Sequence, residues 1–545
     1  MPVVWSSQLP RRVHRLCVLV TATALLVVAC VPAPSRCSVE WVLQQVQVLH
    51  RHGSRSAAPS HNITDICGST PCGYLNPEGE TMMRNVGSFL RKRYTTDLTV
   101  VDEPFLPSQG YDLDVVASRS TDVLRTLQSA ELFLAGMFPD TSRLIPAIHT
   151  VPTDEDMMLF TFSQPWVDLY AMHAEAAQVA RMNPVVDRYF PDWAVLRDLG
   201  KVLWSEDYCS DYARRMMCVV TLFDIAAAKR SVGELPAAAA ARYDDLHAIV
   251  AAWFRYMWYY DPSNTLSVQQ GGRGQLFLQQ VLTNIDDFVA DRNKFKVMHY
   301  SGHDISVAAV WGTLGDSSVY AMQPTYAQTF VLELVKSATT GEHGVRVLRG
   351  WPGQSPDTGF TFSWDSKWKL HCRRSDGTSY AAEDNLCPLE DFRRYVAGTA
   401  GTDPRGMCLL DAETSAVLSC PTGAAEQTSA VALSASCSRY RAVCPAYACE
   451  SGYVLSAPDL RCRCASADCR VPGGGAEPVT VQMTGVAGGA AAGIAIATFC
   501  LGGLFSVLAT VLIMLMVRRR GDGSLTGSVR SDKSMAPDHV EHERM

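Results

Sequence analysis

The chain has 545 residues, enough for a large hydrophobic core and more than one domain, and its 47% hydrophobic and 19% charged residues are typical of globular proteins. The formal net charge of −7 argues against a general nucleic-acid binder, which usually presents a basic face. It does not exclude an anionic substrate, because a few arginines in a cleft dominate the local field.

The N-terminus has the pattern of a secretory signal peptide. Arg11, Arg12 and Arg15 precede an apolar stretch from Leu16 to Val31, which is followed by small residues and prolines. This order of a basic, an apolar and a small-residue region predicts a signal peptide over residues 1–37. An uncleaved signal anchor is the alternative, although the apolar run is short for a permanent span.

Three short segments are predicted to be buried strands that end in polar clusters. Residues 44–49 lead into His50-Arg51-His52-Gly53, residues 114–118 into Arg119, and residues 295–300 into Ser301-Gly302-His303-Asp304. Helices are expected at residues 77–94, 121–137 and 305–314, and a further strand pair at 329–335 and 345–348.

Strands that alternate with helices predict an α/β fold with a largely parallel sheet flanked by helices. Ligands bind such sheets at the carboxyl ends of the strands, where the polar clusters lie. Residues from about 150 to 293 lack a strand pattern, and we expect them to form a helical insertion over this edge.

Cysteines crowd the region that follows. Six of the eighteen lie between Cys437 and Cys469, in a predicted cysteine-rich lumenal region over residues 401–470. With a signal peptide that ends at Cys37, fourteen of the cysteines lie between it and the apolar C-terminal run, which predicts disulfide bonds formed in an oxidising compartment. A zinc knuckle at Cys462, Cys464 and Cys469 is the less favoured alternative. The sequon Asn62-Ile63-Thr64 predicts a glycoprotein.

The C-terminal part predicts a single membrane anchor. A flexible linker over residues 471–485 contains three consecutive glycines, and the run from Val486 to Val517 is long and apolar enough to span a bilayer. Three arginines follow at 518–520, which places the tail of residues 518–545 in the cytoplasm. We therefore expect a single-pass type I membrane protein with its N-terminal part lumenal or extracellular, at the cell surface or in endosomes or lysosomes.

The segment Arg51-His52-Gly53-Ser54-Arg55 offers an imidazole and two guanidinium groups on one turn. Transfer of a phosphoryl group needs cations for the non-bridging oxygens, an in-line nucleophile and an acid for the leaving alkoxide. The planar fork of arginine pairs with two phosphate oxygens at once. Taken alone, the segment fits an exposed basic turn with a structural glycine equally well.

Together with three other motifs, this segment resembles the signature of the histidine acid phosphatase family. Arg119-Ser120-Thr121-Asp122 and His303-Asp304 follow in the family's order, and Leu75-Asn76-Pro77-Glu78-Gly79 is similar to the start of its first helix. The resemblance implies a histidine acid phosphatase domain over residues 38–400. With the signal peptide and the C-terminal span, the chain resembles the membrane-bound acid phosphatases of trypanosomatid parasites.

The resemblance also implies a role for each motif residue. His52 would be the nucleophile that forms a covalent phosphohistidine, and Asp304 would be the general acid. Arg51, Arg55, Arg119 and His303 would bind the phosphate. We interpret Arg125 as a structural partner of Asp122, one helical turn away.

The sequence predicts an acid phosphatase that needs no metal and no cofactor. Its partners would be a phosphomonoester substrate and the membrane, not nucleic acid, and whether it forms a homodimer is left open. Two alternatives remain: a narrower phosphatase for inositol polyphosphates or lysophosphatidic acid, and a non-catalytic surface glycoprotein with the same fold.

Overall fold

A computed structural model describes residues 40–58, 64–97, 101, 103–106, 110–140, 146–204, 208–352, 362–364, 368–421 and 432–465. The predicted signal peptide, linker, membrane span and cytoplasmic tail lie outside these residues, as does Asn62 of the sequon. Within the described ranges, no helix is both long and apolar enough to cross a membrane. All elements that carry the site belong to one unit, formed by residues 1–450 and 455–462.

A seven-stranded sheet lies at the centre of this unit, with the strand order β2-β3-β1-β4-β5-β6 and with β9 paired to β5. Its strands are β1 Trp41–Arg51, β2 Val116–Ser120, β3 Val297–Gly302, β4 Thr329–Ser337, β5 His343–Pro352, β6 Phe362–Trp364 and β9 Leu386–Pro388. Strands β1, β2 and β3 are parallel, and the other pairs are antiparallel. The predicted α/β fold is confirmed, but parallel pairing is limited to the three motif strands. The short link from β4 to β5 makes this pair a hairpin, whose strands are antiparallel.

The register of these parallel strands brings the three polar clusters to the same edge. Arg51 lies opposite Gly302, and Ser120 lies opposite Ser301. The backbone N–H of His52 donates to the carbonyl of Gly302 over 2.9 Å, which extends the ladder one residue beyond β1. The edge where ligands bind α/β sheets therefore carries the motif residues.

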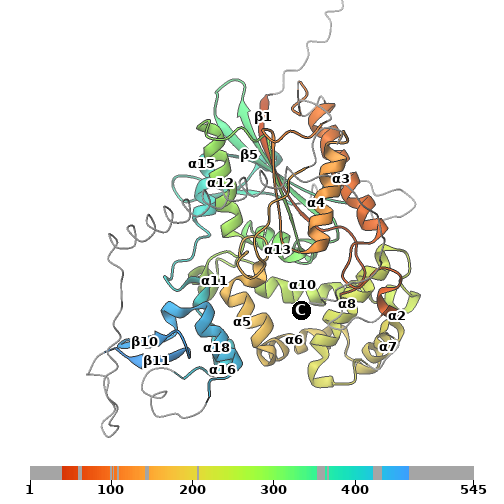
Figure 1. Ribbon diagram of the computed structural model, residues 1–545, viewed down its shortest axis with the longest axis vertical. Helices are drawn as coiled ribbons and strands as arrows, with labels where there is room; N and C mark the ends of the chain where they lie inside the picture. The colour runs from red at the N-terminus through yellow and green to blue at the C-terminus, as the bar shows by residue number, and fades with distance from the viewer. Residues whose placement is uncertain are drawn as a thin grey trace, which may run out of the picture. The chain divides into compact units, whose positions relative to one another are not determined.

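Helices cover both faces of the sheet (Figure 1). Val46 and Val48 of β1 pack in one core with α3 (Pro77–Thr95) and α4 (Leu124–Met137). Leu49 packs in the other core with α12 (Gln275–Val289) and α13 (Asp304–Thr313). Apolar side chains on both faces explain the valine-rich sequence of β1.

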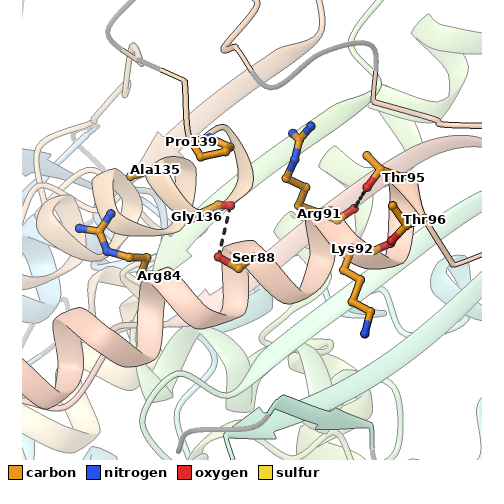
Figure 2. Close-up of a pocket in the computed structure, with 9 residues that line it drawn as sticks. All are labelled: Arg84, Ser88, Arg91, Lys92, Thr95, Thr96, Ala135, Gly136 and Pro139. Atoms are coloured by element: carbon orange, nitrogen blue, oxygen red, sulfur yellow. Dashed lines mark hydrogen bonds between the residues drawn. The ribbon is translucent and has the colours of Figure 1, made fainter. Parts of the chain in front are cut away.

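Helices α3 and α4 cross closely because Gly87 and Gly136 lie at their contact. A Cβ atom at Gly87 would meet the carbonyl oxygen of Phe133, so only glycine fits there. Beside this contact lies an open groove of about 490 Å³ (Figure 2), lined by Arg84, Ser88, Arg91, Lys92, Thr95, Thr96, Ala135, Gly136 and Pro139. No motif residue lines the groove, so it is separate from the clustered strand ends.

A layer of helices follows α4 in the chain and lies beneath α13 in Figure 1. The described elements between residues 161 and 289 are all helical, as predicted for the insertion. They include α5 (Pro165–His173), α6 (Glu175–Tyr189), α7 (Trp193–Trp204), α8 (Arg215–Ser231), α9 (Ala237–Ala240), α10 (Tyr243–Trp258) and α11 (Thr265–Gln270). Since α10 packs against α8, α13 and α14 (Val319–Met322), this layer reaches the edge that carries the motifs.

The remaining named elements are short. They are α2 (Thr64–Cys67), β7 (His371–Arg373), β8 (Ser379–Ala381), α15 (Leu389–Ala397), α16 (Ala412–Leu418), α18 (Ala435–Val443), β10 (Tyr453–Ser456) and β11 (Arg461–Cys464).

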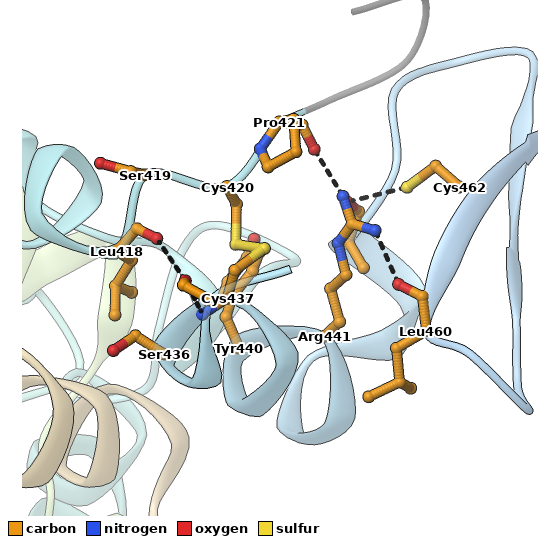
Figure 3. The surroundings of a disulfide bond; sticks show 12 residues. Leu418, Ser419, Cys420, Pro421, Ser436, Cys437, Tyr440, Arg441, Leu460 and Cys462 are labelled. Atoms are coloured by element: carbon orange, nitrogen blue, oxygen red, sulfur yellow. Dashed lines mark hydrogen bonds between the residues drawn. A yellow bond between two sulfur atoms is a disulfide. The ribbon is translucent and has the colours of Figure 1, made fainter. Parts of the chain in front are cut away.

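Disulfide bonds cross-link the described part of the chain between Cys67 and Cys462, and they confirm the prediction that the protein contains disulfides. The described pairs are Cys67–Cys72, Cys209–Cys218, Cys372–Cys387, Cys408–Cys444, Cys420–Cys437 and Cys449–Cys462. Cys464 is also disulfide-bonded, so neither it nor Cys462 is available for a zinc knuckle. Next to the Cys420–Cys437 bond, the buried Arg441 donates to the carbonyl oxygens of Pro421 and Leu460 (Figure 3).

Candidate active site

His52 follows the last residue of β1 and is buried, with 1% of its surface exposed. Its Nδ1 lies 2.8 Å from the carbonyl oxygen of Gly53, which accepts a hydrogen bond and so fixes the proton on Nδ1. The lone pair of Nε2 is then available as a nucleophile. Burial lowers the pKa of His52 well below its usual value, and the charges of Arg125, Arg51 and Arg55 lower it further.

Gly53 allows the loop after His52 to approach helix α3. A Cβ atom at this position would collide with the backbone carbonyl of Gly79, in the first turn of α3. The N–H of Gly53 donates to Ser129 Oγ of α4 over 3.1 Å. The loop is thus fixed from one side by the same two helices that cover β1 and β2.

Arg51 and Asp304 form an ion pair beside His52. Arg51 Nη2 lies 2.9 Å from Asp304 Oδ2, and 20% of the Asp304 side chain is exposed. Arg51 Nη1 donates to the carbonyl of Pro324 over 2.5 Å, and its guanidinium carbon lies 4.4 Å from the ring centroid of Tyr326. Asp304, the first residue of α13, therefore sits at the site with part of its carboxylate open to solvent.

His303 precedes α13 and lies edge-on to His52, with 5.6 Å between the ring centroids. Its Nε2 is 3.0 Å from Thr121 Oγ1, at the end of the second motif. Burial lowers the pKa of His303 well below its usual value. The positive charge of Arg125 lowers this pKa further, and that of Arg51 does so to a smaller extent. His303 is therefore a neutral imidazole that bridges two of the motifs.

Arg55 is held by an acid that the sequence did not point to. Its Nη2 lies 2.8 Å from Oδ1 of Asp224 on α8, and Asp224 Oδ2 accepts from the N–H of Ala58 over 2.8 Å. Burial opposes ionisation of Asp224, but the charge and hydrogen bonds of Arg55 hold its pKa below the usual value. The hydroxyl of Ser54 is also hydrogen-bonded to that of Ser231 of α8 over 2.5 Å, so the helical layer fixes the loop that follows His52. The only feature of the sequence that could have indicated this role of Asp224 is that it is a single acid in an apolar stretch of α8.

The structure pairs Arg119 with an acid that belongs to none of the motifs. Arg119 Nη2 lies 2.6 Å from Asp156 Oδ1, whose side chain is fully buried, and the Arg119 side chain is 26% exposed. Arg119 is opposite Tyr300 in the register, on the sheet face that also carries Leu49. The structure brings together His52, Arg51, Arg55, His303 and Asp304, but it pairs the guanidinium of Arg119 with a different partner.

Arg125, which we had interpreted as a structural partner of Asp122, occupies the site instead. It lies in the first turn of α4, and its buried Nε has no hydrogen-bond partner among the described residues. Among the neighbouring charges that lower the pKa of His52 and of His303, Arg125 has the largest effect. Asp122, by contrast, is exposed. Helical side chains point back towards the N-terminus of their helix, which brings Arg125 to the strand end.

Groups of three or more His, Cys, Asp or Glu side chains suited to a metal ion do not occur in the described part of the chain. The site instead combines three arginines with two neutral histidines and the carboxylates of Asp224 and Asp304. Such a set suits a tetrahedral or trigonal-bipyramidal anion, with a nucleophile and a proton donor next to it.

Residues 64–348, more than half of the chain, match a family model described as "Histidine phosphatase superfamily (branch 2)". Human testicular acid phosphatase is 35% identical over 152 residues, which cover 25% of this chain and 33% of that protein. Rat lysosomal acid phosphatase is 26% identical over 394 residues, which cover 68% of this chain and 81% of that protein. Among solved structures, a phytase from Hafnia alvei in complex with myo-inositol hexakis sulphate aligns with 18% identity and a TM-score of 0.47, covering 70% of this chain and 100% of that one.

Proposed function

Because this chain belongs to the histidine phosphatase superfamily (branch 2), we propose that it hydrolyses phosphate monoesters through a covalent phosphohistidine on His52. The family that the four motifs predicted is confirmed, and its relatives carry the name acid phosphatase. The observation that carries the proposal is the state of His52. Its Nδ1 is hydrogen-bonded to the carbonyl oxygen of Gly53, and the charges of three arginines lower the pKa of the ring, which keeps Nε2 unprotonated.

In the first half of the reaction, Arg51, Arg55 and Arg125 hold the non-bridging oxygens. Nε2 of His52 attacks phosphorus as the bond to the ester oxygen breaks, and Asp304 gives its proton to that oxygen. In the second half, Asp304 takes a proton from water, which attacks the phosphohistidine and releases phosphate. His303, a neutral donor or acceptor beside His52, completes the hydrogen bonding around the phosphoryl group.

Rapid quench tests this proposal directly. The purified chain is mixed with a labelled phosphate monoester, stopped within milliseconds in alkali, and searched for acid-labile phosphate on His52. A labelled His52 peptide supports the proposal, and steady turnover without any labelled histidine contradicts it. A panel of aryl phosphates, inositol polyphosphates and lysophosphatidic acid then separates broad from narrow specificity, and the absence of all turnover identifies a non-catalytic protein.

The third phosphate ligand in this proposal is Arg125, where the sequence had suggested Arg119. We expect Arg125→Ala to lower kcat/KM by roughly 100-fold or more, because it removes a desolvated cation from the developing phosphoryl charge. Arg119→Ala, the matched control on the same strand–helix unit, should cost about tenfold or less, since Arg119 is paired with Asp156. Steady-state kinetics of both variants show which of the two arginines acts as the third phosphate ligand. A larger loss for Arg119→Ala would restore the role that the sequence suggested for it.

We further propose that the predicted helix of residues 486–517 anchors the enzyme with its catalytic part lumenal or extracellular. The six disulfide bonds between described cysteines and the relatives named lysosomal acid phosphatase support an oxidising, lumenal location. A chain that ends at residue 485 is expected to be secreted in active form, whereas the full chain stays with membranes. Fractionation by ultracentrifugation checks this, and a full-length chain found in the soluble fraction would contradict it.

A further inference from the structure

Tyr326 lies at the centre of the site, although it belongs to none of the motifs. It lies in the link from α14 to β4, and 7% of its surface is exposed. Its ring centroid is 5.8 Å from that of His52, and the guanidinium of Arg51 stacks on the ring at 4.4 Å. The side chain therefore borders the space that a phosphoryl group at His52 would occupy.

The hydroxyl of Tyr326 is buried and has no hydrogen-bond partner among the described residues. A buried hydroxyl without a partner costs folding free energy, and native proteins rarely keep one unless it has another use. Four charged groups of the site act on this phenol: Arg55, Asp224, Arg51 and Asp304. The unused donor thus lies where the phosphate-binding cations meet the proposed acid.

The link that carries Tyr326 is tied to the catalytic loop. The N–H of Ala327 donates to the carbonyl of His52 over 3.0 Å, and the N–H of Arg51 donates to the carbonyl of Gln328 over 2.9 Å. Ala327 has a φ of 54°, a left-handed conformation that a non-glycine residue adopts only when its surroundings impose it. The backbone around Tyr326 therefore gives its side chain one defined position beside His52.

The phenol remains a proton donor throughout the acidic and neutral range. Burial raises the pKa of Tyr326 above its usual value, and Asp224 and Asp304 act in the same direction against the nearby arginines. A neutral hydroxyl adds a hydrogen bond to a phosphoryl oxygen without adding charge to a site that already holds three arginines.

We infer that Tyr326 is a further catalytic residue, whose hydroxyl donates a hydrogen bond to a non-bridging oxygen of the phosphoryl group during its transfer to His52. This inference rests on the proposed function. Charge spreads over the equatorial oxygens of the transferring group, so the bond strengthens in the transition state. The alternative is that Tyr326 serves only as an aromatic surface for Arg51.

The variant Tyr326→Phe separates these two roles, because it keeps the ring and removes the hydroxyl. We expect kcat/KM to fall roughly 10- to 100-fold, mostly through kcat. Affinity for vanadate, which mimics the transferring phosphoryl group, should fall by a similar factor. The thermal unfolding temperature should stay the same or rise, because the variant removes an unpartnered buried hydroxyl.

Tyr170→Phe is the matched control. Its hydroxyl is also buried without a partner in the described chain, and its ring stacks on Trp166 at 5.0 Å in the helical layer. This variant should match the parent in kcat/KM and in vanadate affinity. Any activity loss that follows merely from removing a buried hydroxyl would then appear in both variants.

Each outcome decides the inference. Tyr326→Phe with parental kcat/KM and parental vanadate affinity overturns it and leaves the ring as the only contribution of Tyr326. Titration calorimetry with vanadate gives the answer on folded protein even if the variant is less stable. A parent that binds vanadate without turnover contradicts the proposed function, yet the loss or retention of binding in Tyr326→Phe still tests the hydrogen bond.

Discussion

Replacing His52 with alanine is expected to lower kcat by about a thousandfold or more, because no phosphohistidine forms without the imidazole. The protein should still fold, since the side chain of His52 contributes one hydrogen bond, from Nδ1 to the carbonyl of Gly53, and the backbone hydrogen bonds of His52 remain in the variant. Steady-state kinetics and circular dichroism measure both effects. Rapid quench of the variant should show no labelled histidine.

His299→Gln is the matched control for His52→Ala. His299 is also a fully buried histidine of a motif strand, in the middle of β3, but its Nε2 lies 2.8 Å from His50 Nε2 and its Nδ1 lies 2.8 Å from Ser118 Oγ. Both ring nitrogens are thus engaged, so this residue has no lone pair for substrate. Activity of His52→Ala within tenfold of the parent would exclude the nucleophilic role, whereas an equal loss in both variants would point to a folding effect.

The lowered pKa of His52 has a consequence for the pH profile. Burial and the charges of Arg125, Arg51 and Arg55 disfavour the imidazolium form, so Nε2 keeps its lone pair as the pH falls below 6.5, the usual value for histidine. An ordinary histidine would lose nucleophilicity with decreasing pH from that point. We therefore expect kcat/KM to persist in the acidic range.

The second large effect is expected for Asp304→Asn, which removes the proton donor but keeps the shape of the side chain. For alkyl phosphates, whose alkoxide leaves poorly, the rate should fall about 100- to 10,000-fold. For aryl phosphates with an acidic phenol the loss should be far smaller, because the phenolate leaves without a proton. The position of Asp304 supports this role, since it is paired with Arg51 at 2.9 Å and remains 20% exposed towards an entering substrate.

A plot of log kcat/KM against the pKa of the leaving group measures this dependence for parent and variant. The variant should show the steeper negative slope. Parallel lines, with the same loss for every substrate, would show that Asp304 positions Arg51 and does not protonate the leaving group.

The sequence alone determined the family and the fold class, and it predicted most of the candidate site. Arg51, His52 and Arg55 form one continuous segment, and His303 and Asp304 form another, so their chemistry is visible without coordinates. Apolar segments that end in these motifs also identified the three parallel strands. These strands could be predicted because strand periodicity and strand ends are local properties that the neighbouring residues encode.

Only the tertiary structure reveals the different surroundings of Arg119 and Arg125, on which the proposed role of Arg125 rests. Both arginines lie near the end of β2, six residues apart, and a motif cannot tell which way each side chain points. Arg119 lies within a strand, and the alternation of strand side chains sends it to the face where Asp156 binds it. Arg125 lies in the first turn of α4, whose packing on the sheet directs it to the two histidines.

Asp224 and Tyr326 likewise became visible only through folding. Asp224 lies 169 positions from its partner Arg55, on a helix whose sequence gives no sign of a phosphate site. Tyr326 precedes β4, and only the antiparallel pairing of β4 with β1 places it beside His52. Such contacts depend on the register and packing of distant segments, which are set by the whole core and are not written in any local pattern of residues.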